Sequence, residues 1–243
     1  MAGTLGRVGI VFVSHSVKIA EGLVDLARQM AGTTTLVAAG GTDDGGIGTS
    51  FEKVSAAVGE ADSGAGVAIF CDLGSAILTA ETALDFLDEE VQARVRIVSA
   101  PLVEGGVAAA VAAESGASLD DVVAAGESAN EATPSKVADA GEGAVAAVPV
   151  FEAEAAASGT PSRTVTILNK DGLHARPAAE FVKLASSFPV KVTVNGKDAK
   201  SLLGIMSMGL TKGAQVEIAS ADPEGADAVN ALADLVETGF GEA

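Results

Sequence analysis

The sequence of 243 residues contains no tryptophan and no tyrosine, and its 8 phenylalanines are its only aromatic residues. Hydrophobic residues nevertheless make up 48% of the chain. We therefore expect cores built from Val, Ile, Leu and Ala, whose small side chains pack closely. The single cysteine, Cys71, excludes an internal disulfide and is typical of a protein in a reducing compartment.

Long apolar runs are also missing. No stretch approaches the roughly 18 uninterrupted apolar residues of a membrane span, and the first residues show no signal-peptide pattern. These features predict a soluble, cytoplasmic protein without a membrane partner. Two isolated histidines without clustered cysteines or carboxylates do not suggest a metal site. The sequence has no G-x-x-x-x-G-K-[ST] run, so we expect no bound nucleotide and no other cofactor.

Basic residues are scarce, and the net charge of -18 argues against a nucleic-acid partner. The charge is uneven along the chain. Residues 1–161 hold 7 basic and 23 acidic residues, whereas residues 162–221 hold 8 basic and 4 acidic ones. The second half could therefore be attracted to the first. Ordinary solvated surface charge explains the same pattern equally well.

The pattern of apolar residues predicts two domains joined by a linker. Within residues 1–126, apolar runs alternate with helical segments, which indicates a parallel α/β sheet covered on both faces. The expected strands are 7–13, 35–39, 66–71 and 95–99, and the expected helices are 17–30, 51–58, 75–87 with Ser75 as a possible cap, and one opened by Pro101.

Residues 127–161 are rich in Ala, Gly, Ser and Glu with little periodicity, which predicts a flexible, acidic linker. Residues 162–243 predict the order βαββαβα, an α+β domain with an antiparallel sheet and helices on one face. A hairpin is expected around Asn195-Gly196, a strong turn signal.

The chain has only two histidines, His15 and His174, and each follows a predicted strand at or near the start of a helix. A helix N-terminus carries partial positive charge and unpaired N–H groups that bind phosphate. A neutral imidazole there offers a nitrogen lone pair for attack on phosphorus. A single histidine is more often structural, but two in the same setting favour two phosphoryl acceptors.

In the second domain, the run from Asn169 to Ala179 reads NKDGLHARPAA. Gly172 permits a sharp bend, Pro177 suits a first helical turn, and Arg176 could hold a phosphoryl oxygen. GLHARPAA and KSLLGIMSMGL at 200–210 resemble HPr, the histidine phosphocarrier of the bacterial phosphotransferase system, over residues 163–238. The resemblance implies that enzyme I phosphorylates His174 from phosphoenolpyruvate, with Arg176 supporting the phosphate.

The resemblance to HPr also assigns possible roles to four further residues. Ser201 matches a serine that a regulatory kinase modifies in some HPr proteins, although we favour its interpretation as a helix N-cap. Leu202, Leu203 and Met206 match the patch on which HPr docks to enzyme I. From the sequence alone, these three could equally be core residues of a short helix.

In the first domain, Ser14, His15 and Ser16 follow the first strand, at the sheet edge where such folds bind ligands. Asp72 follows the third strand and could orient His15, or it could be a plain helix cap. Gly74 and Ser75 then offer backbone N–H groups at another helix start.

The runs GIVFVSHS, DLGSAILTAETAL and APLVEGGVAAAVAAESGA resemble the phosphoryl-donor subunit of dihydroxyacetone kinase, which has a mannose-type enzyme IIA fold. This resemblance implies that His15 is phosphorylated, with Asp72, Gly74 and Ser75 near it, and that the domain forms a homodimer. We expect the polar residues around His15 to stabilise the phosphate: Ser14, Ser16, Asp72, Gly74 and Ser75.

Together the two resemblances imply a phosphotransferase component. Phosphate would pass from enzyme I to His174, to His15, and then to ADP on the nucleotide-binding subunit of dihydroxyacetone kinase. A mannose-class enzyme IIA–HPr component of a sugar transporter is the first alternative, against which the run CDLGSA at 71–76 speaks. A non-catalytic module that signals its phosphorylation state is the second.

Overall fold

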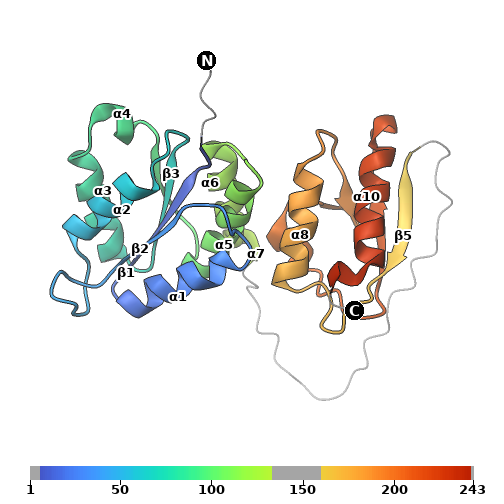
Figure 1. The fold of residues 1–243 in the computed structure, drawn as a ribbon, viewed down its shortest axis with the longest axis horizontal. Helices are drawn as coiled ribbons and strands as arrows, with labels where there is room; N and C mark the ends of the chain where they lie inside the picture. Colours follow the sequence, from blue (N-terminus) through green and yellow to red (C-terminus); the bar gives the residue numbers. More distant parts are fainter. Residues whose placement is uncertain (1–5, 133–159, 242–243) are drawn as a thin grey trace.

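The computed structural model describes residues 6–132 and 160–241, which form two units (Figure 1). The first unit contains four parallel strands, paired in the order β2-β1-β3-β4. All four expected strands are confirmed, with ends that differ by one or two residues. Their bounds are β1 (Gly9–Ser14), β2 (Leu36–Gly40), β3 (Val67–Cys71) and β4 (Val95–Val98).

Helices cover both faces of this sheet, as the sequence predicts (Figure 1). Alternate side chains of β1 serve the two faces, since Ile10 and Phe12 join one apolar cluster while Val11 and Val13 join the other. One face carries α1 (Val17–Arg28), α5 (Leu102–Glu114) and α6 (Leu119–Glu127), and the other carries α2 (Phe51–Ala61) and α3 (Gly74–Asp85). A short α4 (Glu89–Gln92) precedes β4.

Two helix starts differ from the expectation. The N-cap of α3 is Leu73 and not Ser75, which lies inside the first turn. The amide of Leu73 donates to the carboxylate of Asp72 at 2.7 Å, and the helix begins at the next residue, Gly74. Pro101 is the N-cap of α5 and precedes its first turn.

The helical structure also extends further than the sequence predicts. Neither α6 nor α7 (Ala129–Ala132) was expected, and α7 lies within the predicted linker. Ala129 is buried, and the Asn130 side chain donates to the carbonyl of Ser99 at 2.7 Å, so both residues belong to the first unit. Residues 133–159 of the predicted linker lie outside the described residues, and residues 160 and 161 lead directly into β5 (Ser162–Thr166).

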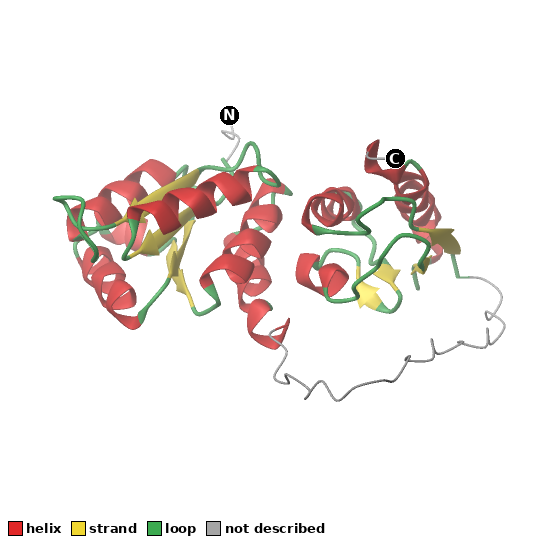
Figure 2. Cartoon of the chain, turned by 90° about the horizontal axis from the view of Figure 1, so that it is seen from below, coloured by secondary structure: helices red, strands yellow, loops and turns green. Residues whose placement is uncertain are grey.

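The second unit has the predicted order βαββαβα, with an antiparallel sheet in the order β5-β8-β6-β7. Figure 2 shows its helices gathered on one side of the strands, and α10 contacts both β5 and β8. Asn195 and Gly196 have φ values of 47° and 79°, which confirms the expected turn. The elements are β5 (Ser162–Thr166), α8 (Ala175–Ser186), β6 (Thr193–Val194), β7 (Lys197–Asp198), α9 (Leu202–Met206), β8 (Gln215–Ala219), the 3-10 turn Pro223–Gly225, α10 (Ala226–Glu237) and the 3-10 turn Gly239–Gly241.

The two units touch through helices, with α8 and α9 against α5. Lys183 of α8 lies 3.4 Å from the carboxylate of Glu114 on α5, an ion pair between the basic and the acidic half of the chain. The helices that make this contact are not the elements that hold His15. Within the described ranges, no helix is both long enough and apolar enough to cross a membrane.

Candidate active site

His15 lies at the carboxyl edge of the parallel sheet, between the end of β1 and the start of α1. Its side chain is 20% exposed, so the ring is held by the protein yet can be reached from solvent. The neighbouring Ser14 is buried, and its hydroxyl donates to Asp72 at 2.8 Å. Ser16 is the N-cap residue of α1, although its side chain makes no capping bond.

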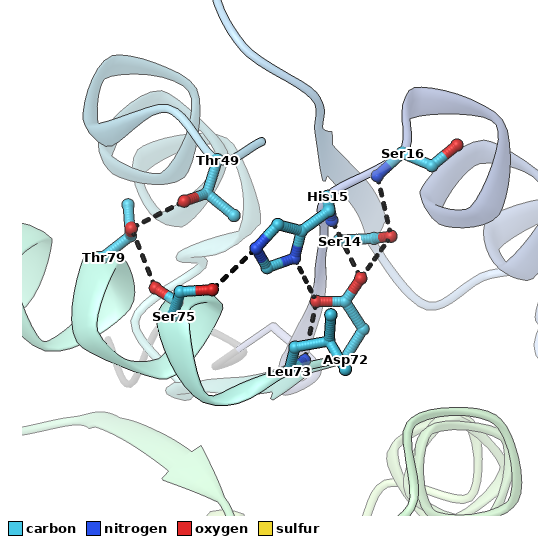
Figure 3. Close-up of polar contacts among 8 residues, drawn as sticks. All are labelled: Ser14, His15, Ser16, Thr49, Asp72, Leu73, Ser75 and Thr79. Atoms are coloured by element: carbon cyan, nitrogen blue, oxygen red, sulfur yellow. Dashed lines mark hydrogen bonds and ion pairs between the residues drawn. The ribbon is translucent and has the colours of Figure 1, made fainter. Parts of the chain in front are cut away.

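The carboxylate of Asp72 makes two hydrogen bonds to His15 (Figure 3). Its Oδ1 lies 2.9 Å from Nδ1 of the His15 ring, and its Oδ2 accepts from the His15 amide at 2.8 Å. Burial raises the pKa of Asp72, but hydrogen bonds, first those from the amide and ring of His15, outweigh it and hold the pKa below its ordinary value. Asp72 is therefore ionised at neutral pH and can only accept hydrogen bonds. The same carboxylate also accepts from the amide of Leu73, so Asp72 contacts the start of α3 as well as orienting the histidine.

This contact decides the tautomer of the His15 ring. Because ionised Asp72 requires a donor, the proton of the neutral ring is on Nδ1 and the lone pair is on Nε2. Nε2 lies 2.7 Å from the hydroxyl of Ser75, which donates to it. Nε2 therefore carries the lone pair of the ring and accepts this hydrogen bond.

The first turn of α3 lies beside Nε2 and supplies a setting for an anion. Gly74 and Ser75 are the first two residues of this 12-residue helix, and both are exposed. The amides at a helix start have no intrahelical partner and attract negative charge. The structure thus brings Asp72, Gly74 and Ser75 together around His15, as the sequence predicts.

Sequence reasoning missed Thr49 and Thr79, which lie on the other side of Ser75 (Figure 3). Thr79 donates to the Ser75 carbonyl at 3.1 Å, and the hydroxyls of Thr49 and Thr79 are 2.7 Å apart. Thr49 ends the glycine-rich loop that follows β2, and the amide of Gly48 in that loop donates to the carbonyl of His15 at 3.0 Å. The position of this loop after a parallel strand was the signal available in the sequence.

His174 is the N-cap residue of α8 and is exposed to solvent. The bend before it depends on Gly172, whose φ is 72° and whose missing Cβ would lie 2.2 Å from the Leu210 carbonyl. Pro177 lies in the first turn of α8, as expected. Arg176 lies in the same turn, 63% exposed, with its Nε 3.7 Å from Glu180. His174 and Arg176 thus share one exposed helix start.

The other residues singled out in this unit lie on α9. The Ser201 hydroxyl accepts from the Gly204 amide at 3.1 Å, which confirms that Ser201 is an N-cap. Leu202 is buried, Leu203 is half-buried and Met206 is 38% exposed. Of the three, Leu203 and Met206 are therefore accessible to a partner.

Cys71 ends β3 next to Asp72 but does not add a reactive group. Burial, together with the charges of Asp72 and Glu81, raises the pKa of the thiol to about 12. Across the described ranges, no cluster of three or more His, Cys, Asp or Glu side chains is arranged to hold a metal.

Residues 9–123 match the family model described as "PTS system fructose IIA component", and residues 161–238 match that of the "PTS HPr component phosphorylation site". The phosphoryl donor subunit DhaM of PEP-dependent dihydroxyacetone kinase 2 from Listeria innocua is 46% identical over 43% of this chain and 84% of its own length. The chain belongs to the DhaM family of phosphoryl donor subunits.

Two further relatives extend the match to the second unit. DhaM of Escherichia coli (strain K12), a PEP-dependent dihydroxyacetone kinase phosphoryl donor subunit, is 36% identical over 97% of this chain and 51% of its own length. The chain thus spans about half the length of this curated relative. Phosphocarrier protein HPr of Pseudomonas putida is 40% identical over 34% of the chain and 97% of its own length.

Proposed function

We propose that the chain relays phosphoryl groups through two transient phosphohistidines, first His174 and then His15, as the donor component of a phosphoenolpyruvate-dependent dihydroxyacetone kinase. The observation that carries this proposal is the His15 ring, fixed by Asp72 with Nε2 directed at the start of α3. Enzyme I would charge His174 from phosphoenolpyruvate. His15 would pass the group to ADP held by the nucleotide-binding kinase subunit.

The geometry accounts for the transfer to His15. The Nε2 lone pair forms a new bond to phosphorus while the bond from phosphorus to the His174 ring breaks, and that electron pair returns to the His174 ring. The proton on Nδ1 stays in its hydrogen bond to Asp72, which stabilises the positive charge that develops on the attacking ring. The hydroxyl of Ser75 and the amides of α3 then face the phosphoryl oxygens.

The surface around His15 suits partner docking. Exposed large apolar side chains follow the carboxyl end of every strand of the first unit, and we name this set the apolar collar: Ile19, Ile47, Leu73, Ile77, Leu78 and Val103. The carboxyl ends of parallel strands share the sheet edge that carries His15, and exposed apolar groups at such an edge suit a protein interface. We propose that the HPr unit and the kinase subunit use the collar in turn, and that enzyme I docks near His174 on Leu203 and Met206.

Intact mass after mixing the chain with enzyme I and phosphoenolpyruvate, without free HPr, tests the relay. We expect two added phosphoryl groups in the wild type, one in His15→Ala and none in His174→Ala. Full charging of His174→Ala at His15 would contradict the order. Addition of the ADP-loaded kinase subunit should then discharge His15, whereas a sugar-transport or signalling component would retain its phosphate.

Transfer within one chain and transfer between chains predict different results for mixed variants. The described contact between the units is made mainly by α5 and α7 against α8 and α9, and not by the turn of α3 beside His15, so we propose that transfer from His174 to His15 requires another arrangement or a second chain. We propose a homodimer through the first unit, which light scattering can test. Mixed His15→Ala and His174→Ala chains should regain phosphate on His15 only if phosphate crosses between chains.

A further inference from the structure

We infer that Thr49 is a positioning residue of the His15 site, which acts through Thr79 on the turn of α3 that carries Ser75. The inference rests on the proposed transfer to Nε2 and adds a residue to it. Thr49 comes from the loop after β2, whereas its target lies on α3, so the contact joins two separate segments around the reactive nitrogen (Figure 3).

The direction of the hydrogen bonds follows from the number of protons. Thr79 donates its only hydroxyl proton to the Ser75 carbonyl, one turn earlier in α3. In the contact of 2.7 Å between the two threonine hydroxyls, Thr79 must therefore accept and Thr49 must donate. The chain of bonds runs from Thr49 to Thr79 to the backbone of Ser75, and the Ser75 hydroxyl continues it to Nε2 of His15.

The loop that carries Thr49 needs such an anchor. Its three residues with positive φ are Gly41, Gly45 and Gly48, and glycine loses the most conformational freedom when a backbone is ordered. Lys53 of α2 fixes the beginning of the loop by donating to the carbonyls of Gly40 and Thr42. Thr49 fixes its end against α3.

The same end of the loop also holds His15. Gly48, the residue before Thr49, donates its amide to the His15 carbonyl at 3.0 Å. Through these adjacent residues the loop binds the backbone of the nucleophile on one side and the turn of Ser75 on the other. Thr49 thereby helps to set the position of the Ser75 hydroxyl relative to Nε2.

The test compares Thr49→Val, which removes the hydroxyl and keeps the shape, with Thr49→Ser, which restores it. Thr82→Val is the matched control, because Thr82 makes the same bond to a carbonyl one turn earlier in α3, Leu78, but is not linked to Ser75. Loss of one neutral hydrogen bond should slow transfer to His15 about five- to tenfold in Thr49→Val. Thr49→Ser and Thr82→Val should transfer at close to the wild-type rate.

A second readout does not require activity. In long-range proton–nitrogen NMR spectra of the unphosphorylated chain, the Nε2 signal of His15 reports the hydrogen bond from Ser75. We expect that signal to shift in Thr49→Val in the same direction as in Ser75→Ala, and to stay unchanged in Thr82→Val. An unchanged Nε2 signal in Thr49→Val, or an equal defect in Thr49→Ser, overturns the role of the hydroxyl. A wild type that accepts no phosphate contradicts only the proposed function.

Discussion

The Asp72 carboxylate binds both the backbone and the ring of His15, with one oxygen 2.8 Å from the amide and the other 2.9 Å from Nδ1. Such a double contact fixes the main chain and the ring together, so the ring cannot turn without losing a charge-assisted bond. The side chain of Asp72 is only 15% exposed, which keeps water from competing for it.

The first prediction is that Asp72→Asn loses most of its transfer to His15. An asparagine amide can place its NH2 against Nδ1 and so favour the tautomer with the proton on Nε2, which blocks the nucleophile. In enzymes where a carboxylate orients a catalytic histidine, this change costs on the order of 10⁴ in rate, and we expect a fall of at least about 100-fold here. Rapid-quench measurement of the rate at which phosphorylated HPr transfers its phosphoryl group to His15 tests this prediction. Asp85→Asn, on the exposed side of α3, is the control and should transfer normally.

The main parts of this site could be predicted because they depend on sequence position. Parallel strands place their carboxyl ends at one edge, so His15 after β1 and Asp72 after β3 were expected at the same edge, and the pairing of β1 with β3 makes them neighbours. Thr49 and Thr79 could not be assigned in the same way. Their contact depends on how a glycine-rich loop folds back over the sheet edge, and sequence periodicity does not determine that path.

The helices α6 and α7 were missed for a different reason. The side of α6 that faces the core presents Gly126, and a Cβ there would lie 2.8 Å from the ring of Phe70. Glycine is not counted as apolar in a search for helical periodicity, even where it packs against an aromatic ring. The apolar pattern of α6 is therefore too weak to predict a helix. In α7, burial of Ala129 supplies a contact that composition alone does not reveal.

The second prediction concerns Glu114, which the sequence did not single out. Its carboxylate is buried and accepts three hydrogen bonds of 2.8–3.0 Å from Thr33 and Thr34. Burial raises the pKa of Glu114, but the bonds from these threonines outweigh it and lower the pKa from 4.5 to about 2. A lowered folded-state pKa stabilises the protein above the ordinary pKa and stops doing so as pH falls toward the folded value.

Glu114→Gln should therefore lower the free energy of unfolding by on the order of 2–3 kcal/mol at neutral pH. The difference from wild type should shrink as pH falls from about 4.5 toward 2. Urea denaturation at several pH values measures both. Glu60→Gln on the exposed side of α2 serves as the control. Equal stability of Glu114→Gln and wild type at neutral pH would show that the carboxylate contributes nothing.

The third prediction tests the apolar collar. Leu78 is 64% exposed on α3, so Leu78→Ser should leave the fold intact while weakening contact with a partner. We expect the concentration of kinase subunit that gives half-maximal transfer to rise about tenfold, a change typical of losing a substantial interface side chain. Leu26→Ser, at a position on α1 that is 45% exposed and outside the collar, is the control. A steady-state titration in which both variants behave alike would argue against docking at Leu78.

The fourth prediction uses two helical glycines with opposite surroundings. A Cβ on Gly106 of α5 would lie 2.5 Å from the ring of Phe12. Phe12 is fully buried in the sheet, so its ring cannot shift without disturbing the packed core. Gly106→Ala should therefore destabilise the first unit by about 1–3 kcal/mol. A Cβ on Gly59 of α2 would meet nothing within 4 Å.

Gly59→Ala should therefore gain about 0.5–1 kcal/mol, because alanine loses less backbone freedom in a helix. Thermal unfolding of the two variants beside the wild type measures the opposite signs. If both substitutions stabilised the protein, helix propensity alone would govern them and α5 would not pack closely on the sheet. Opposite signs would show instead that glycine at 106 is required because α5 lies directly against Phe12.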